Sequence, residues 1–294
     1  MKKVAIVIIN FNGKDDTIAC LNSLEKFCKG DTAIYNIILV DNASKFPIDD
    51  SILKHYSIPI YYYRSSENLG FAGGNNYGIM QYKNAKQNAD YYLLLNNDTV
   101  LVDYSLNQLV EASAHSEYSI TGMVNYYYDN PLEVWQAGSV FNANKLKSRE
   151  LYPKDDNLEF VEADNVPGSS LMIKKDALED IGLLDERFFA YYEEVELCAR
   201  AKQKGYKVAF LSGTKILHKV GRASTSFFKH YLRTRNTLLL YRLHYSNNMY
   251  MGYIRVFIRT IKCSVSNLQL FYWSSFVKGI RDYKKKQFYL GTCK

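Results

Sequence analysis

The chain has 294 residues, 47% of them hydrophobic, which is enough for one large domain or for a domain with an extension. It contains no run of about 18 uninterrupted apolar residues, so we expect no membrane-spanning helix. The five cysteines are scattered and form no CxxC pair. This excludes a typical zinc site or disulfide framework and favours a reducing cytoplasm.

The net charge of +7 is distributed unevenly along the chain. Residues 229–294 carry 13 Lys and Arg against a single acid, Asp282, a net of +12. Residues 1–228 carry 24 basic and 29 acidic residues, a net of −5. We therefore predict a globular domain over 1–228 and a basic C-terminal extension over 229–294. Nucleic acid and an anionic membrane are the two obvious partners for such an extension.

The first hundred residues alternate between predicted strands and predicted helices. Short apolar, β-branched segments predict buried strands, and apolar residues at helical spacing predict helices. Strands are expected over 4–9, 37–40, 58–63 and 91–95, and helices over 15–27 and 73–87. This alternation is typical of an α/β fold with a mostly parallel, doubly wound sheet.

Beyond residue 100 the predicted pattern is mixed. Strands are expected over 119–127, 134–141, 168–173 and 208–211, and helices over 175–181 and 193–204. Residues 251–273 predict one amphipathic helix. Its apolar face comprises Ile254, Phe257, Ile258, Ile261, Val265 and Leu268, and its basic face comprises Arg255, Arg259, Lys262 and Ser266. Such a helix either lies on a membrane surface or packs on the domain with its basic face in solvent.

Polar residues follow three of the predicted parallel strands. These residues are Asn10 and Asn12, Asp41 and Asn42, and Asn96, Asn97 and Asp98. The carboxyl ends of parallel strands share one edge of the sheet, where α/β proteins bind ligands. The three strand ends together could hold the base, ribose and diphosphate of a nucleotide. Asp98 adds a hard oxygen ligand of the kind that suits Mg²⁺ or Mn²⁺.

A glycine-rich segment over 67–76 opens the helix predicted before the fourth strand. Its candidate binding residues are Asn68, Gly70, Gly73 and Asn75. Glycines allow close backbone approach, and a helix N-terminus favours anions. The segment is neither a Walker loop nor a GxGxxG motif, so an ordinary glycine-rich turn explains it equally well at this point.

The second half supplies two further candidates. Glu193 and Glu194 follow Tyr191 and Tyr192, and burial beside a like charge can raise a carboxyl pKa into the range of a general base. Alternatively, these acids simply favour the start of a helix. His218 follows a strand and is either structural or a second metal ligand beside Asp98.

Taken together, these segments resemble family 2 glycosyltransferases of the GT-A fold. The resemblance covers about residues 3–240 and is carried by residues 7–13, 41–44, 67–76, 96–98, 167–170 and 191–200. Residues 68–75, His218 and the pair Arg235-Asn236 are similar to bacterial rhamnosyltransferase-like members. The resemblance implies a mixed sheet flanked by helices, here with a basic helical extension.

The resemblance also implies an activity. It is the inverting transfer of a sugar from dTDP-rhamnose or a UDP-sugar to a hydroxyl of a glycan or lipid-linked saccharide, in surface polysaccharide synthesis. Asp98 and His218 would bind Mg²⁺ or Mn²⁺, although Asn96 replaces the first acid of the family's Asp-x-Asp motif. Glu194 would be the base, Glu193 a supporting acid, and Arg235 a donor-binding residue.

The acidic candidate pocket makes nucleic acid an unsuitable partner. We expect the basic extension to bind an anionic membrane, which places the protein in the cytoplasm, peripheral on the inner face of the membrane. A non-catalytic sugar-nucleotide-binding scaffold is the main alternative. A sugar nucleotidyltransferase is disfavoured, because it would need a glycine- and arginine-rich loop where Asn10 to Lys14 stand.

Overall fold

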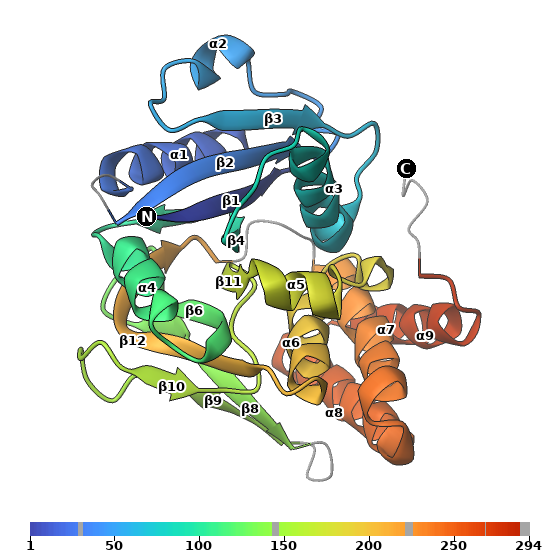
Figure 1. Ribbon diagram of the computed structural model, residues 1–294. Coiled ribbons are helices and arrows are strands. Elements are labelled where there is room, and N and C mark those ends of the chain that lie inside the picture. Colours follow the sequence, from blue (N-terminus) through green and yellow to red (C-terminus); the bar gives the residue numbers. More distant parts are fainter. Residues whose placement is uncertain (29–31, 143–146, 221–225, 268, 289–294) are drawn as a thin grey trace.

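The computed structural model describes residues 1–28, 32–142, 147–220, 226–267 and 269–288 (Figure 1). Its main sheet has the order β10-β12-β6-β11-β4-β1-β2-β3. These strands are β1 (Lys2–Asn10), β2 (Ala33–Asp41), β3 (Ile60–Arg64), β4 (Tyr91–Asn96), β6 (Tyr118–Tyr127), β10 (Phe160–Glu162), β11 (Ser170–Lys174) and β12 (Lys207–His218). Short strands β5 (Thr99–Leu101) and β7 (Val134–Gln136) pair with β12 and β6.

The helices are α1 (Lys14–Phe27), α2 (Asp50–Leu53), α3 (Gly70–Asn84), α4 (Ser105–Ala114), α5 (Lys175–Ile181), α6 (Glu193–Gln203), α7 (Ser226–His244), α8 (Met249–Asn267) and α9 (Phe271–Lys284). Single 3₁₀ turns lie at η2 (Glu186–Phe188) and η3 (Ser246–Asn248). The alternating first half is confirmed, whereas α2, β5 and α4 occupy segments for which we predicted no element.

The parallel block β3-β2-β1-β4 brings the polar strand ends together. Asn10 pairs with Asp41 across β1 and β2, and Ile9 pairs with Asn96 across β1 and β4. β11 then runs antiparallel to both β4 and β6, which makes the sheet mixed. The predicted convergence of three polar strand ends at one edge is therefore confirmed.

Helices cover the sheet on both faces. On β1, Ile6 and Ile8 pack with α1 and α4, whereas Ala5 and Val7 pack with α3, α5 and α6. Because successive side chains of a strand point to opposite faces, a strand covered on both sides is apolar throughout. This explains the uninterrupted apolar run of β1.

The strand predicted over 134–141 is wrong in one respect. It is divided into β7 and β8 (Gly138–Asn142), and β8 leaves the main sheet to pair with β9 (Lys147–Leu151). Likewise, the single helix predicted over 251–273 is two helices, α8 and α9, separated near residues 269–270. Leu268, assigned to its apolar face, lies outside the described residues.

The C-terminal helices share a core with the rest of the chain. Leu238 and Leu239 of α7, Val256 of α8 and Phe288 pack in one apolar cluster with Phe188. Figure 1 shows α7, α8 and α9 gathered beside α6, away from β1 to β3. The predicted boundary between residues 228 and 229 falls inside α7. Residues 289–294 of the predicted extension lie outside the described residues.

Helix α8 directs Arg255 and Arg259 inward, while Lys262 and most of the predicted apolar face are exposed. Ile254, Phe257, Ile258, Ile261 and Val265 are 39–69% exposed. Arg259 instead donates to the Tyr192 hydroxyl at 3.0 Å and to the Arg233 carbonyl at 2.8 Å. The alternative of a helix packed on the domain with a solvated basic face is borne out in part. Helix α8 packs on the domain through Val256, and Lys262 and Ser266 are exposed, but Arg255 and Arg259 are directed inward. None of the helices in the described ranges combines the length and apolar character needed to cross a bilayer.

Candidate active site

At the carboxyl edge of the sheet, Asn10 and Asp41 form a buried hydrogen-bonded pair. The Asn10 carboxamide donates to Asp41 Oδ2 at 3.2 Å and accepts from the Gly13 amide at 3.1 Å. Asp41 Oδ1 accepts from the Ser44 amide at 2.9 Å. Each carboxylate oxygen can accept more than one hydrogen bond, so Asp41 keeps acceptor capacity for a nucleotide.

The other predicted donor-binding residues also shape this edge. Asn42 bonds Asn68 and the Gly70 carbonyl, both at 3.0 Å. The backbone of Gly70 has a φ of +71°, and a β-carbon there would collide with the Phe189 carbonyl, so only glycine fits. Three further hydrogen bonds hold predicted residues: the Lys45 amide donates to Asn12, Asn97 donates to Thr17, and Asn75 donates to the Phe71 carbonyl. At Gly73, a β-carbon would lie 3.0 Å from Leu69 Cβ.

Asp98 and His218 are brought together as predicted for a metal site. Strand β12 pairs His218 with Thr99 of β5, which places His218 Nε2 3.1 Å from Asp98 Oδ1. Among the described residues, His218 Nδ1 is buried without a hydrogen-bond partner, whereas buried Asp98 Oδ1 has the contact with His218. A buried polar atom of this kind points to an absent ligand.

The pair fits Mg²⁺ or Mn²⁺ only with help from the substrate. In the part of the chain that the structure describes, no third His, Cys, Asp or Glu joins Asp98 and His218 to form a metal-binding group. Mg²⁺ commonly uses one or two protein carboxylates together with substrate phosphates. The residues present therefore suit a metal bound jointly with a diphosphate.

Glu193 and Glu194 begin α6, directly after two residues with left-handed backbones. The φ angles of Tyr191 and Tyr192 are +70° and +77°. Burial and the neighbouring Glu194 raise the pKa of Glu193 well above its ordinary value. Burial also raises the pKa of Glu194, although backbone amides and Arg233 oppose this. Both carboxyls keep a buried Oε2 without a partner among the described residues.

Asn236 and Arg235 of α7 hold the loop before these glutamates. The Asn236 carboxamide donates to the carbonyls of Phe188, Ala190 and Tyr191 at 2.8–2.9 Å. Arg235 is fully buried and donates to the carbonyls of Arg187, Phe188 and Phe288 at 2.9–3.0 Å. These bonds occupy its guanidinium, so the prediction that Arg235 binds the donor is replaced by a positioning role.

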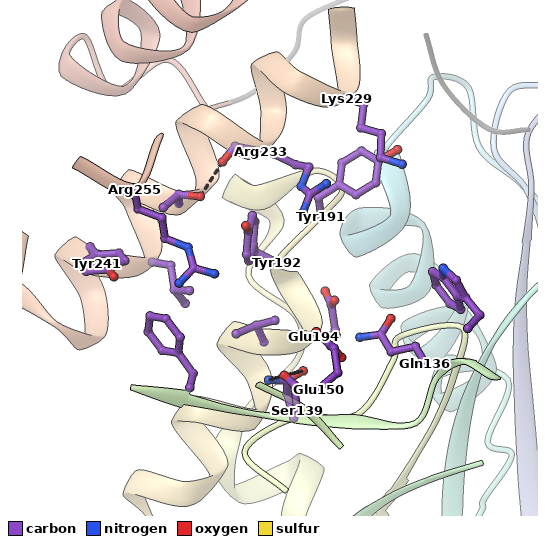
Figure 2. A pocket seen from close by; sticks show the side chains of 16 residues that line it. Gln136, Ser139, Glu150, Tyr191, Tyr192, Glu194, Lys229, Arg233, Tyr241 and Arg255 are labelled. Atoms are coloured by element: carbon purple, nitrogen blue, oxygen red, sulfur yellow. Dashed lines mark hydrogen bonds between the residues drawn. The ribbon is translucent and has the colours of Figure 1, made fainter. Parts of the chain in front are cut away.

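Two cavities meet at Glu194. The Asp98 cavity, of about 260 Å³, is lined by residues that include Asp98, His218, Glu193 and Glu194. The arginine cavity, of about 340 Å³, is lined by residues that include Glu194, Tyr192, Lys229, Arg233 and Arg255. Figure 2 shows the basic side chains approaching the second cavity from the helices, with Glu194 and Gln136 on the opposite side. Glu194 therefore faces both spaces.

Reasoning from the sequence missed the basic lining of the arginine cavity. The signal that could have found it is the spacing of Lys229 and Arg233, which lie four residues apart and share one face of a helix. The sequence does not reveal that this face meets Arg255 of the next helix.

Comparison with known proteins identifies the family. The sequence profile described as "Glycosyl transferase family 2" matches residues 5–182, more than half of the chain. The chain belongs to this family. It is therefore a glycosyltransferase that transfers a sugar from a nucleotide-sugar donor.

Two curated relatives of the glycosyltransferase carry related names. The chain is 29% identical to the low-salt glycan biosynthesis hexosyltransferase Agl10 of Haloferax volcanii, over 80% of this chain and 74% of the relative. It is 22% identical to the dTDP-rhamnosyl transferase RfbF of Shigella flexneri, over 70% of each chain.

Solved structures confirm the GT-A-like fold. The mannosyltransferase of Pyrobaculum calidifontis, in complex with GDP-Man and Mn²⁺, has a TM-score of 0.61 at 10% identity and aligns over 98% of this chain and 87% of its own. GalNAc-T7 with UDP, GalNAc and Mn²⁺ has a TM-score of 0.59 at 14% identity. That match covers 81% of the glycosyltransferase but only 51% of the GalNAc-T7 chain.

Replacing Asn236 with Leu should loosen the loop that precedes Glu193. The substitution keeps the side-chain size but removes the donor to the Ala190 and Tyr191 carbonyls and one of the two side-chain donors to the Phe188 carbonyl. The free energy of unfolding should therefore fall by at least about 1–3 kcal/mol. The transfer rate should also fall while nucleotide affinity is kept. Chemical denaturation and nucleotide titration measure both effects, with the exposed Asn84→Leu as the control. Unchanged stability and rate would show that the three bonds are unimportant.

Proposed function

We propose that the glycosyltransferase inverts the anomeric carbon of a nucleoside-diphosphate sugar while transferring it to a hydroxyl of a glycan or lipid-linked saccharide. The position of Glu194 carries this proposal. It lines both the Asp98 cavity and the arginine cavity, so one carboxyl can reach a donor on one side and an acceptor on the other. In inverting transfer, the base must activate a hydroxyl on the face opposite the leaving group.

Glu194 is the proposed general base. It takes the proton of the acceptor hydroxyl as that oxygen bonds to the anomeric carbon, while the bond from this carbon to the diphosphate oxygen breaks. A raised pKa makes a carboxylate a stronger base, provided that it is ionised at the working pH. Burial and the neighbouring Glu194 raise the pKa of Glu193 well above its ordinary value, which suits a supporting acid beside the base.

The proposed donor site lies between the strand ends and the start of α3. The nucleotide would contact residues from the predicted set Asn10, Asn12, Asp41, Asn42, Asn68, Gly70, Gly73, Asn75 and Asn97. Asp98 and His218 would hold Mg²⁺ or Mn²⁺, which supplies positive charge beside the departing diphosphate. The Mn²⁺ in both solved structures supports this metal class. The name of the rhamnosyl relative supports dTDP-rhamnose, and UDP-sugars remain the second donor class.

We also propose that the outer surface of α8 and α9 rests on an anionic membrane, on the cytoplasmic side. The exposed apolar residues of α8 are followed by exposed Leu270, Trp273 and Val277 on and just before α9. Exposed Arg281 and residues 284–286, all Lys, then add positive charge. Apolar area together with basic residues is the combination that binds anionic lipid surfaces, at about 1 kcal/mol per basic residue.

Replacing Asp98 with Ala should lower the transfer rate at least about 100-fold, since one charged group at a leaving diphosphate contributes roughly this much. Stabilisation of the protein by UDP or dTDP should also lose its dependence on Mn²⁺. Thermal unfolding with nucleotide, with and without metal, measures the second effect. The exposed Asp129→Ala should behave as wild type. A metal-dependent shift retained in Asp98→Ala would contradict the proposed metal site.

Replacing Glu194 with Gln should reduce turnover by about 10²- to 10⁴-fold, with donor affinity close to wild type. In the wild type, the rate should rise with pH as Glu194 ionises, at a pKa above its ordinary value of 4.5. Glu193 is the supporting acid in this proposal, so Glu193→Gln should be milder and should leave this acidic limb in place. Initial rates across pH test both expectations. An inactive Glu193→Gln beside an active Glu194→Gln would reverse the assignment.

Placing glutamates on the outer face of α8, as Phe257→Glu with Ile261→Glu, should weaken binding to anionic vesicles at least about tenfold, because the charges oppose burial in the lipid interface. Nucleotide binding should be unaffected. The matched control is Met80→Glu with Leu158→Glu, which charges similarly exposed residues elsewhere. Equal vesicle sedimentation of the two double variants would argue against membrane docking through α8.

A further inference from the structure

The arginine cavity is lined by more basic than acidic side chains. Lys229 and Arg233 come from α7, Arg255 comes from α8, and Arg259 lies behind them, bonded to the Arg233 carbonyl. Within the described ranges, no carboxylate lies within 4.0 Å of the charged nitrogens of Lys229, Arg233 or Arg259. Partly buried cations are costly unless they meet an anion.

The neighbours of these cations include aromatic rings, hydroxyls and carbonyls. Arg255 lies over the ring of Phe141, at 4.8 Å from its centroid, and Arg259 donates to the Tyr192 hydroxyl. Burial alone would raise the pKa of Tyr192, but Arg259, Arg233 and Arg255 outweigh it and bring this pKa down to about 7. The cavity is therefore a region of strongly positive potential, to which an anion would be attracted.

Two acids, Glu150 and Glu194, border the cavity, and burial raises the pKa of both. Even with Glu194 ionised, as its proposed role as base requires, the basic side chains outnumber it. Glu194 is one of five residues that line both this cavity and the Asp98 cavity, with Trp135, Gln136, Tyr191 and Lys229. An anion bound among the arginines would lie beside the base, on the side away from Asp98.

We propose that the arginine cavity binds the diphosphate through which the acceptor saccharide is attached to a lipid. This inference rests on the proposed function, because it places the acceptor where Glu194 can reach it. Guanidinium groups match phosphate oxygens with two parallel hydrogen bonds, which makes arginine the preferred partner for this anion. The volume of about 340 Å³ suits a small polar ligand.

The two sides of α8 connect the anion to a lipid. Arg255 lines the cavity, while its neighbours Ile254 and Phe257 are exposed on the outer apolar face. A diphosphate held by Arg255 would therefore lie one helix thickness from the surface proposed to meet the membrane. A phosphate belonging to a soluble glycan would offer the same anion but would make no use of this apolar surface.

Direct binding tests the proposal without any knowledge of the acceptor sugar. Geranyl diphosphate, geranyl monophosphate and geraniol are titrated into the full chain by calorimetry, in excess EDTA so that metal-dependent binding at Asp98 is suppressed. We expect the diphosphate to bind at least about tenfold more tightly than geraniol. Arg255→Gln and Arg233→Gln change residues that line the arginine cavity and not the Asp98 cavity. Each should weaken diphosphate binding by roughly tenfold, as the loss of one charge-assisted contact requires.

The controls separate this site from the donor site. Lys262→Gln changes an exposed lysine of α8 that does not line the cavity, and Asp98→Ala changes the other cavity. Both should bind geranyl diphosphate as wild type does. Equal binding of geraniol, or diphosphate binding lost in Asp98→Ala but kept in Arg255→Gln and Arg233→Gln, would overturn the inference. Inorganic diphosphate binding as tightly as geranyl diphosphate would assign the site to a soluble phosphate and overturn the lipid part.

The outcome is independent of the transfer assay. If the cavity binds diphosphate but Glu194→Gln keeps full turnover, the anion site stands and the proposed mechanism fails. If Glu194→Gln is inactive but no variant of the cavity alters diphosphate binding, the mechanism stands and the acceptor assignment fails. Circular dichroism of each variant excludes a general loss of folding.

Discussion

The backbone of residues 187–192 is the constraint on which the site depends. It lies between α3 and α7, and both helices are bonded to it: the Ala72 amide donates to the Phe189 carbonyl, and Asn236 binds three further carbonyls of the segment. Left-handed backbones at Phe189, Tyr191 and Tyr192 are unfavourable by themselves and persist because these bonds compensate for them. Helix α6 starts directly afterwards, so the direction of Glu193 and Glu194 is set by this segment.

This constraint also connects the two halves of the chain. Gly70 opens α3 at the donor edge and must be glycine because the Phe189 carbonyl lies against it. Phe188, one residue earlier, packs into the core of α7 and α8. A change in the backbone of residues 187–192 would therefore displace the proposed donor edge, the proposed base and the lining of the arginine cavity together. For this reason the C-terminal helices belong to the site rather than simply following it.

Local patterns predicted the parts of the molecule that depend on neighbouring residues. The apolar run of β1 and its polar end at Asn10 were sufficient to place a buried strand and a ligand-binding edge, because parallel register then aligns Asn10 with Asp41. The residues alone left His218 either structural or a second metal ligand beside Asp98, and the resemblance favoured the second, since 120 residues separate the two and no spacing rule joins them.

The orientation of α8 is a feature that local sequence patterns could not predict. Helical spacing correctly grouped Ile254 with Phe257 and Arg255 with Arg259, but it could not say which group meets the protein. That depends on Tyr192 and the Arg233 carbonyl, which provide polar partners on the inner side. Arg235 was assigned to the donor by the resemblance, whereas the structure shows its guanidinium bonded to backbone carbonyls.

Helix α8 carries arginines on one side and exposed apolar side chains on another. The rotation of the helix about its own axis therefore decides which side meets the protein. Each residue of an α-helix advances by about 100°. One residue inserted into η3 would keep every amino acid of α8 and yet rotate Arg255 and Arg259 away from Tyr192, bringing isoleucines in their place. The number of residues between α7 and α8 thus decides which side chains of α8 face Tyr192. A deletion there would disturb this packing more than most substitutions within the helix.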